Sequence, residues 1–129
     1  MPCHFEFDKD NQVLCTVLEG KYSFSDFLSS REETQRQIVE RKPFAGIWDF
    51  SEVTSYDVTP TEARQMAATP SVYPADTAQF FVAPTDYVYG MLRMFQVFSE
   101  HTRPGLRVAR TRAEVHKALG IQEMKFARI

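Results

Sequence analysis

Glycine, cysteine and histidine are all scarce in this chain of 129 residues. The five glycines are isolated, so they form neither a Walker loop nor the Gly-x-Gly-x-x-Gly turn that holds nucleotide phosphates. The two cysteines and three histidines are scattered rather than grouped as zinc ligands, and no Gly-x-Ser-x-Gly elbow occurs. We therefore expect no metal, no cofactor and no complete catalytic site, so that the chain is not an enzyme.

The chain also has little net charge and no long apolar run. Fifteen basic and seventeen acidic side chains leave a formal net charge of −2, which provides no long-range attraction for nucleic acid. No apolar run approaches the roughly 20 residues that span a bilayer, and the start of the chain lacks the pattern of a signal peptide. We expect a soluble, cytoplasmic protein with no nucleic-acid partner, no membrane span and reduced thiols at Cys3 and Cys15.

Strand-like and helix-like segments alternate along the chain. Two strand-like runs, residues 4–8 and 13–19, flank a polar turn and predict an antiparallel hairpin. Apolar runs typical of buried strands follow at residues 45–50, 79–83 and 106–110. Helical patterns cover residues 23–40, 60–68, 87–101 and 111–120, and Arg31 interrupts the apolar stripe of the first.

This order predicts an α/β fold, because alternating strands and helices pair mainly in parallel through right-handed crossovers. The expected order is β-β-α-β-α-β-α-β-α, a mixed and mostly parallel sheet with an N-terminal antiparallel hairpin and with helices packed on the sheet. No linker or repeat divides the chain, so residues 1–129 form one domain. Residues 121–129 are either an edge strand or a C-terminal tail.

Several helix ends have marked capping sequences. Thr59 and Glu62 have the spacing of a capping box, and Pro60 suits the first helical position between them. Thr111 and Glu114 form a second capping box, and Gly120 suits the end of that helix. Helices should therefore begin at residues 60 and 112.

Acidic and hydroxyl side chains follow the predicted parallel strands. Ligands of open α/β sheets bind beyond the carboxyl ends of parallel strands, where Asp49, Asp57, Thr59 and Asp86 should lie. These residues are candidates for a binding site. The same residue types also cap helices and are favoured at helix N-termini, so capping alone is the competing explanation for them.

Aromatic residues are numerous, with eleven Phe and five Tyr. Five of the Phe residues fall in predicted strands and belong to the core, whereas Tyr56, Tyr73, Tyr87 and Tyr89 cluster near the candidate edge. They are therefore candidate contacts for a small apolar ligand in a pocket at the carboxyl edge of the sheet. A carrier of such a ligand or of a lipid is the alternative function.

Residues 49–60, Asp-Phe-Ser-Glu-Val-Thr-Ser-Tyr-Asp-Val-Thr-Pro, resemble the motif of STAS (anti-sigma-factor-antagonist) domains. In that motif a strand ends in Asp-Leu-Ser, and Asp-Ser-Ser-Gly opens a helix. Residues 87–95, including Arg93, are similar to a helix start of short SpoIIAA-like bacterial proteins, mostly uncharacterised. The resemblance implies a SpoIIAA-like fold and adds Arg93 to the candidate binding residues.

The resemblance also implies a mode of action. In the antagonist branch a kinase phosphorylates the serine that falls on Thr59, and the unphosphorylated protein binds a partner through this helix edge. Here Pro60 replaces the glycine of the motif and Val58 replaces its first serine. We expect a non-enzymatic binding or regulatory module that acts through protein–protein contact and forms a homodimer through the apolar helix from Tyr87 to His101.

Overall fold

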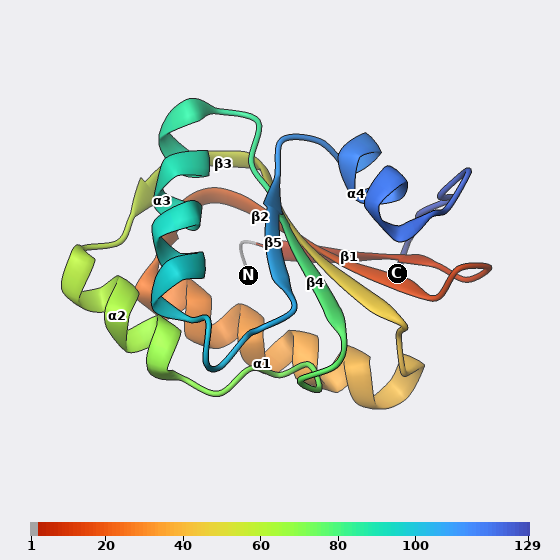
Figure 1. Ribbon diagram of the computed structural model, residues 1–129, viewed down its shortest axis with the longest axis horizontal. Helices are drawn as coiled ribbons and strands as arrows, with labels where there is room; N and C mark the ends of the chain where they lie inside the picture. Colours follow the sequence, from red (N-terminus) through yellow and green to blue (C-terminus); the bar gives the residue numbers. More distant parts are fainter. Residues whose placement is uncertain (1–2) are drawn as a thin grey trace.

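The computed structural model describes residues 3–129, so residues 1 and 2 of the predicted domain lie outside the described part. Within that part, six strands form one sheet in the order β5-β4-β3-β2-β1-β6 (Figure 1). The strands are β1 (Cys3–Asp8), β2 (Val13–Ser23), β3 (Ala45–Asp57), β4 (Ala78–Val82), β5 (Leu106–Ala109) and β6 (Ala127–Arg128). β1 pairs antiparallel with β2 and β6, whereas β2 to β5 run parallel. The predicted mixed α/β sheet with its N-terminal hairpin is confirmed.

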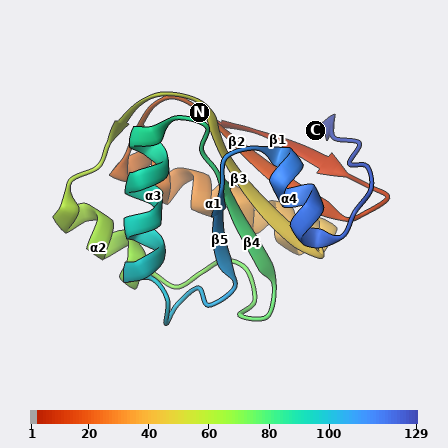
Figure 2. The same cartoon turned by 45° about the horizontal axis from the view of Figure 1, so that its top comes forward.

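The helices cover both faces of this sheet. They are α1 (Phe24–Arg41), α2 (Pro60–Ala68), α3 (Asp86–Phe98) and α4 (Arg112–Leu119). From β2 to β5 each strand adds to the same side of its predecessor, so right-handed crossovers place α1, α2 and α3 on one face. The chain then returns from β5 to the far edge, and α4 covers the opposite face (Figure 2).

The predicted capping boxes are confirmed. Thr59 accepts a hydrogen bond from the Glu62 amide at 3.1 Å, and Thr111 accepts one from the Glu114 amide at 3.2 Å. Gly120 ends α4 in the left-handed conformation with φ 71°. These local signals need no tertiary contact, because the capping groups satisfy backbone amides of their own first turn.

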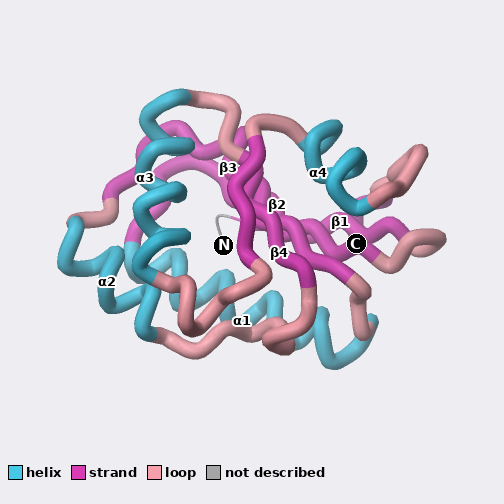
Figure 3. The backbone as a smooth tube through the Cα atoms, in the orientation of Figure 1, coloured by secondary structure: helices cyan, strands magenta, loops and turns pink. Residues whose placement is uncertain are grey.

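Two elements differ in length from their predictions. β3 continues to Asp57 instead of ending near residue 50, because the second half of β2 pairs with it as far as Ser23. Register shifts beside Gly20, with φ 70°, let this two-stranded arm curve away from β4 (Figure 3). α3 ends at Phe98 rather than at residue 101. At this end the Ser99 hydroxyl donates to the Phe95 carbonyl at 2.8 Å.

The side chains of β3 alternate between two hydrophobic clusters. Trp48 and Phe50 face α1 to α3, whereas Ala45 and Ile47 face α4. Burial on both faces explains the nearly continuous apolar sequence of this strand. Among residues 3–129 no helix has the length and apolar character needed to cross a membrane.

The C-terminal segment is partly an edge strand. Its two-residue strand β6 pairs with β1, while Met124 and Phe126 pack on the cluster beneath α4. The buried Asp8 carboxylate accepts the Lys125 amide at 3.1 Å and also accepts hydrogen bonds from Asn11. Asp8 therefore joins this segment to the β1–β2 turn.

Candidate functional site

Asp49 and Asp57, which were predicted to share one edge, lie at separate places along β3. β3 pairs with β4 only as far as Asp49, opposite Val82, and then continues beside β2 alone. Asp49 therefore lies within a strand, not at its end as the sequence predicted. At about 3.3 Å per residue, the strand from Asp49 to Asp57 spans roughly 26 Å. These two carboxylates consequently do not form one site.

Asp49 belongs to an ion-pair network beneath α4. The side chain is buried, accepts the Ser51 amide at 2.9 Å, and accepts a hydrogen bond from Arg112 Nε at 2.8 Å. Arg112 also donates from Nη1 to Glu6 at 2.8 Å, and its guanidinium lies 4.9 Å from the Phe126 ring centroid. Arg112 thus joins β1, β3 and the C-terminal segment at the start of α4.

His4 extends the same network along β1. Its Nδ1 lies 2.7 Å from a Glu19 carboxylate oxygen, and its Nε2 lies 3.0 Å from Glu6. The hydrogen bond to Glu19 raises the pKa of His4, against burial and the nearby Arg128 charge, which lower it. Burial would raise the pKa of Glu6, but hydrogen bonds from Arg112 and His4 hold it below its ordinary value.

These shifts predict a stability maximum in mildly acidic solution. Hydrogen bonds, chiefly from Asn11, outweigh burial and lower the pKa of Asp8, so Asp8 and Glu6 stabilise the fold above their ordinary values of 3.8 and 4.5. His4 contributes fully below its ordinary pKa of 6.5, and its contribution is lost as pH rises through its higher folded value. The free energy of unfolding, measured with urea across pH, should therefore peak between pH 4.5 and 6.5. His4→Gln should remove the decline just above pH 6.5, and an unchanged decline there would refute the assignment. A loss at still higher pH has other causes, because burial also raises the pKa of Cys3 and Tyr56.

Asp57 and Thr59 lie at the exposed start of α2. Asp57 pairs with Lys21 at 3.3 Å, with both side chains more than half exposed. The Thr59 hydroxyl acts as the N-cap, the alternative that the sequence left open. Tyr56 is buried beside them; its hydroxyl has no partner within the described chain, and burial raises its pKa.

Asp86, Tyr87 and Arg93 lie on the outer surface of α3. Asp86 accepts a hydrogen bond from Arg110 Nη1 at 2.7 Å, and Arg110 lies over the Tyr89 ring at 3.9 Å. Tyr87 is 63% exposed and Arg93 is also exposed. Tyr87 and Arg93 thus lie on the exposed side of α3, whereas Asp86 is joined through Arg110 to the edge where Asp49 and Arg112 lie.

An open groove of about 380 Å³ lies where β3 and β4 separate. Asp49, Ser51, Arg110 and Arg112 contribute to its lining. Asp49 is held by Arg112 and a backbone amide, and Arg110 is paired with Asp86. Asp49, Arg110 and Arg112 are therefore engaged in contacts that stabilise the fold.

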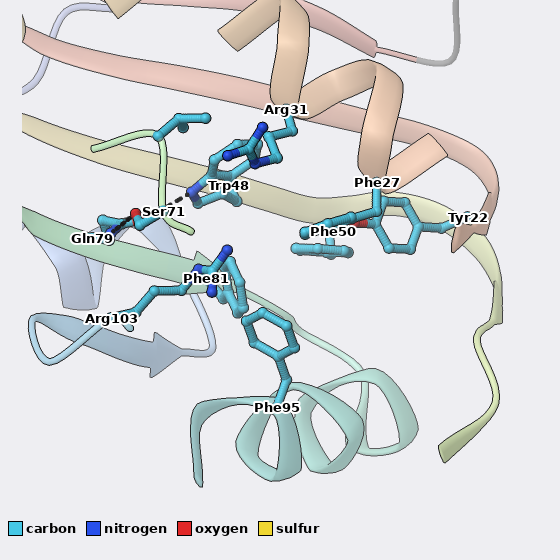
Figure 4. A pocket seen from close by; sticks show the side chains of 11 residues that line it. Tyr22, Phe27, Arg31, Trp48, Phe50, Ser71, Gln79, Phe81, Phe95 and Arg103 are labelled. Carbon is cyan, nitrogen blue, oxygen red and sulfur yellow. Dashed lines mark hydrogen bonds between the residues drawn. The ribbon is translucent and has the colours of Figure 1, made fainter. Parts of the chain in front are cut away.

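The sequence prediction missed a second group of side chains on the opposite face of the sheet. Arg31, Trp48, Gln79 and Arg103 line a small cavity together with aromatic rings from β2, β3, β4, α1 and α3 (Figure 4). Arg31 was the one signal in the sequence, since it interrupts the apolar stripe of α1. Arg103 carried no such signal, because its burial depends on the packing of the loop that follows α3.

Comparison of the chain with protein-family models finds no match, and comparison with curated proteins finds no significant match.

Proposed function

We propose that this chain is a non-enzymatic binding or regulatory module of the STAS-like, SpoIIAA-like kind, which acts through protein–protein contact as a homodimer. The α/β fold and the sequence of residues 49–60 support the family assignment. The observation that carries the mode of action is an exposed stripe along α3. The partner we infer for this stripe is a second copy of the chain.

The stripe consists of Tyr87, Gly90, Met94 and Val97, at spacings of three, four and three residues. Tyr87 and Val97 are each 63% exposed, and no atom lies within 4 Å of where a Gly90 Cβ would be. The other face of α3 buries Leu92 in the core. A stripe with this spacing is typical of a seam between two helices, and a glycine within it permits close approach of the backbones.

A two-fold axis suits this stripe, because a symmetric dimer pairs the same surface on both copies. In an antiparallel pair of α3 helices centred near residues 93 and 94, Gly90 of one copy faces Val97 of the other. The same register brings Tyr87 toward Glu100, an exposed carboxylate in the turn that follows the helix. Apolar contact and a polar rim would then occur together.

Val97→Glu should convert the dimer into a monomer. The substitution places a carboxylate on each side of the two-fold axis, where it loses water without gaining a partner. We expect the dissociation constant to rise at least about tenfold. Size-exclusion chromatography with light scattering over a concentration series measures this.

Val39→Glu is the matched control, since Val39 is 69% exposed on α1, away from the stripe. That variant should retain the wild-type mass. A wild-type chain that stays monomeric at micromolar concentration, or a Val97→Glu variant that stays dimeric, would contradict the homodimer.

A further inference from the structure

The cavity that the sequence did not predict lies between the sheet and α1, beside the loop at residues 69–77. Figure 4 shows aromatic rings of Tyr22, Phe27, Phe50, Phe81 and Phe95 around it, with Trp48 at one wall. Its volume is about 20 Å³, room for about one water molecule before any side chain moves. Only a small group therefore fits into the cavity without movement of side chains.

Arg103 brings an unpaired charge into this apolar surrounding. The residue is 7% exposed, and its guanidinium lies 5.3 Å from the Phe95 ring centroid. Nη1 makes both of its hydrogen bonds, to the Ala67 carbonyl at 3.3 Å and the Thr102 hydroxyl at 3.1 Å. Among residues 3–129 no carboxylate lies within 4.0 Å of it, so its charge has no counter-ion.

Arg31 adds a second positive charge from α1. Its Nε and Nη2 both donate to the Pro70 carbonyl, at 3.2 and 2.8 Å, and it likewise forms no ion pair within the described chain. Burial and the Arg31 charge lower the pKa of Arg103 to about 10, so the Arg103 guanidinium is charged at neutral pH. Arg31 is only half-buried, but the buried charge of Arg103 is costly unless an anion compensates it.

Trp48, Gln79 and Ser71 of the cavity wall form hydrogen bonds with one another. Trp48 Nε1 donates to Gln79 Oε1 at 3.4 Å, and Gln79 Nε2 donates to the Ser71 hydroxyl at 2.9 Å. These bonds fix the wall without using the guanidinium groups. Nε and Nη2 of Arg103 thus remain as donors for an incoming acceptor.

We propose that this cavity binds the carboxylate of a short organic acid, with Arg31 and Arg103 as donors to its oxygens and the aromatic rings around its apolar end. A planar guanidinium matches the two oxygens of a carboxylate. A strongly hydrated dianion such as phosphate suits the apolar lining poorly. Because the cavity has room for about one water molecule, an acid of two to four carbons enters only when side chains move, and an aromatic acid would need a larger movement. This site is independent of the α3 stripe and of the homodimer.

Trp48 reports on this cavity directly, because it is the single tryptophan of the chain. Its fluorescence is titrated with acetate, propionate, butyrate, benzoate, chloride and phosphate at constant ionic strength. We expect a saturable change for the three short acids and a weaker response to benzoate, chloride and phosphate. No saturable change with any short acid, or chloride binding as tightly as acetate, would overturn the proposal.

Arg103→Met tests the role of the buried guanidinium. It should weaken acetate binding at least about tenfold, as expected for loss of a charge-assisted hydrogen bond. Without acetate its melting temperature should equal or exceed that of the wild type, because an uncompensated buried charge has been removed. Unchanged acetate affinity would exclude Arg103 and refute the site.

Arg107→Met is the matched control, since Arg107 is exposed and lies over the Phe80 ring at 5.0 Å on the other face of the sheet. It should bind acetate like the wild type. Should Arg103→Met fail to fold, Arg31→Met gives the same comparison at the half-buried mouth. The monomeric Val97→Glu variant should also retain acetate binding, which separates this proposal from the homodimer.

Discussion

Gly46→Ala should be the most destabilising single-methyl change in the core, with a loss of at least about 3 kcal/mol in the free energy of unfolding. A Cβ at this position in β3 would lie 2.6 Å from Cε2 of Tyr73 and closer still to its Cζ and hydroxyl. The Tyr73 ring is 3% exposed and packs edge-on against Trp48, with ring centroids 6.2 Å apart. The ring therefore has no free space into which to move. Urea unfolding of the variant measures the loss.

The double variant Gly46→Ala/Tyr73→Ala isolates this contact. Tyr73→Ala alone should cost about 3–5 kcal/mol through the cavity that it leaves. Adding Gly46→Ala to it should cost less than about 1 kcal/mol, because the clashing ring is gone. Strictly additive losses would show that the glycine is needed for another reason.

Arg112→Met should lower the free energy of unfolding by roughly 2–3 kcal/mol. The change leaves Asp49 buried with only the Ser51 amide as partner. It also removes the hydrogen bond that Glu6 accepts from Arg112. We place the loss below that of a fully buried ion pair because the Arg112 side chain is 31% exposed. Urea unfolding at neutral pH measures the difference.

Arg110→Met is the matched control two residues earlier. Its partner Asp86 has a side chain that is 96% exposed, so the loss should stay below about 1 kcal/mol. Adding Asp49→Asn to Arg112→Met removes the stranded carboxylate and should restore about half of the stability. If the second substitution deepens the loss instead, the network is not held by charge.

The local elements of this fold could be predicted because their causes lie within a few residues. Thr59 and Thr111 cap helices through groups three positions away, and Gly120 ends α4 because glycine adopts positive φ at little cost. Alternation of strands with helices then restricted the sheet to parallel crossovers. The curved extension of β3 was missed because its cause is the pairing of a distant strand, β2.

The candidate sites depended more heavily on long-range packing. Asp49 was identified from its place after an apolar run, yet its role follows from Arg112, which lies sixty-three residues later and reaches it only across the sheet. Arg31 and Arg103 lie on α1 and on the loop after α3, and no sequence spacing relates them. Their proximity exists only because three crossovers place these elements on one face.

The α/β class, the hairpin and the helix caps follow from the sequence, since each depends on neighbouring residue types. Which charges have partners follows instead from the packing of distant segments. Arg112 and Arg103 are the same residue type in the sequence. The guanidinium of Arg112 is stabilised by Glu6 and Asp49, whereas that of Arg103 lies among aromatic rings. They differ in burial and counter-charge, and those depend on contacts between segments that folding alone brings together.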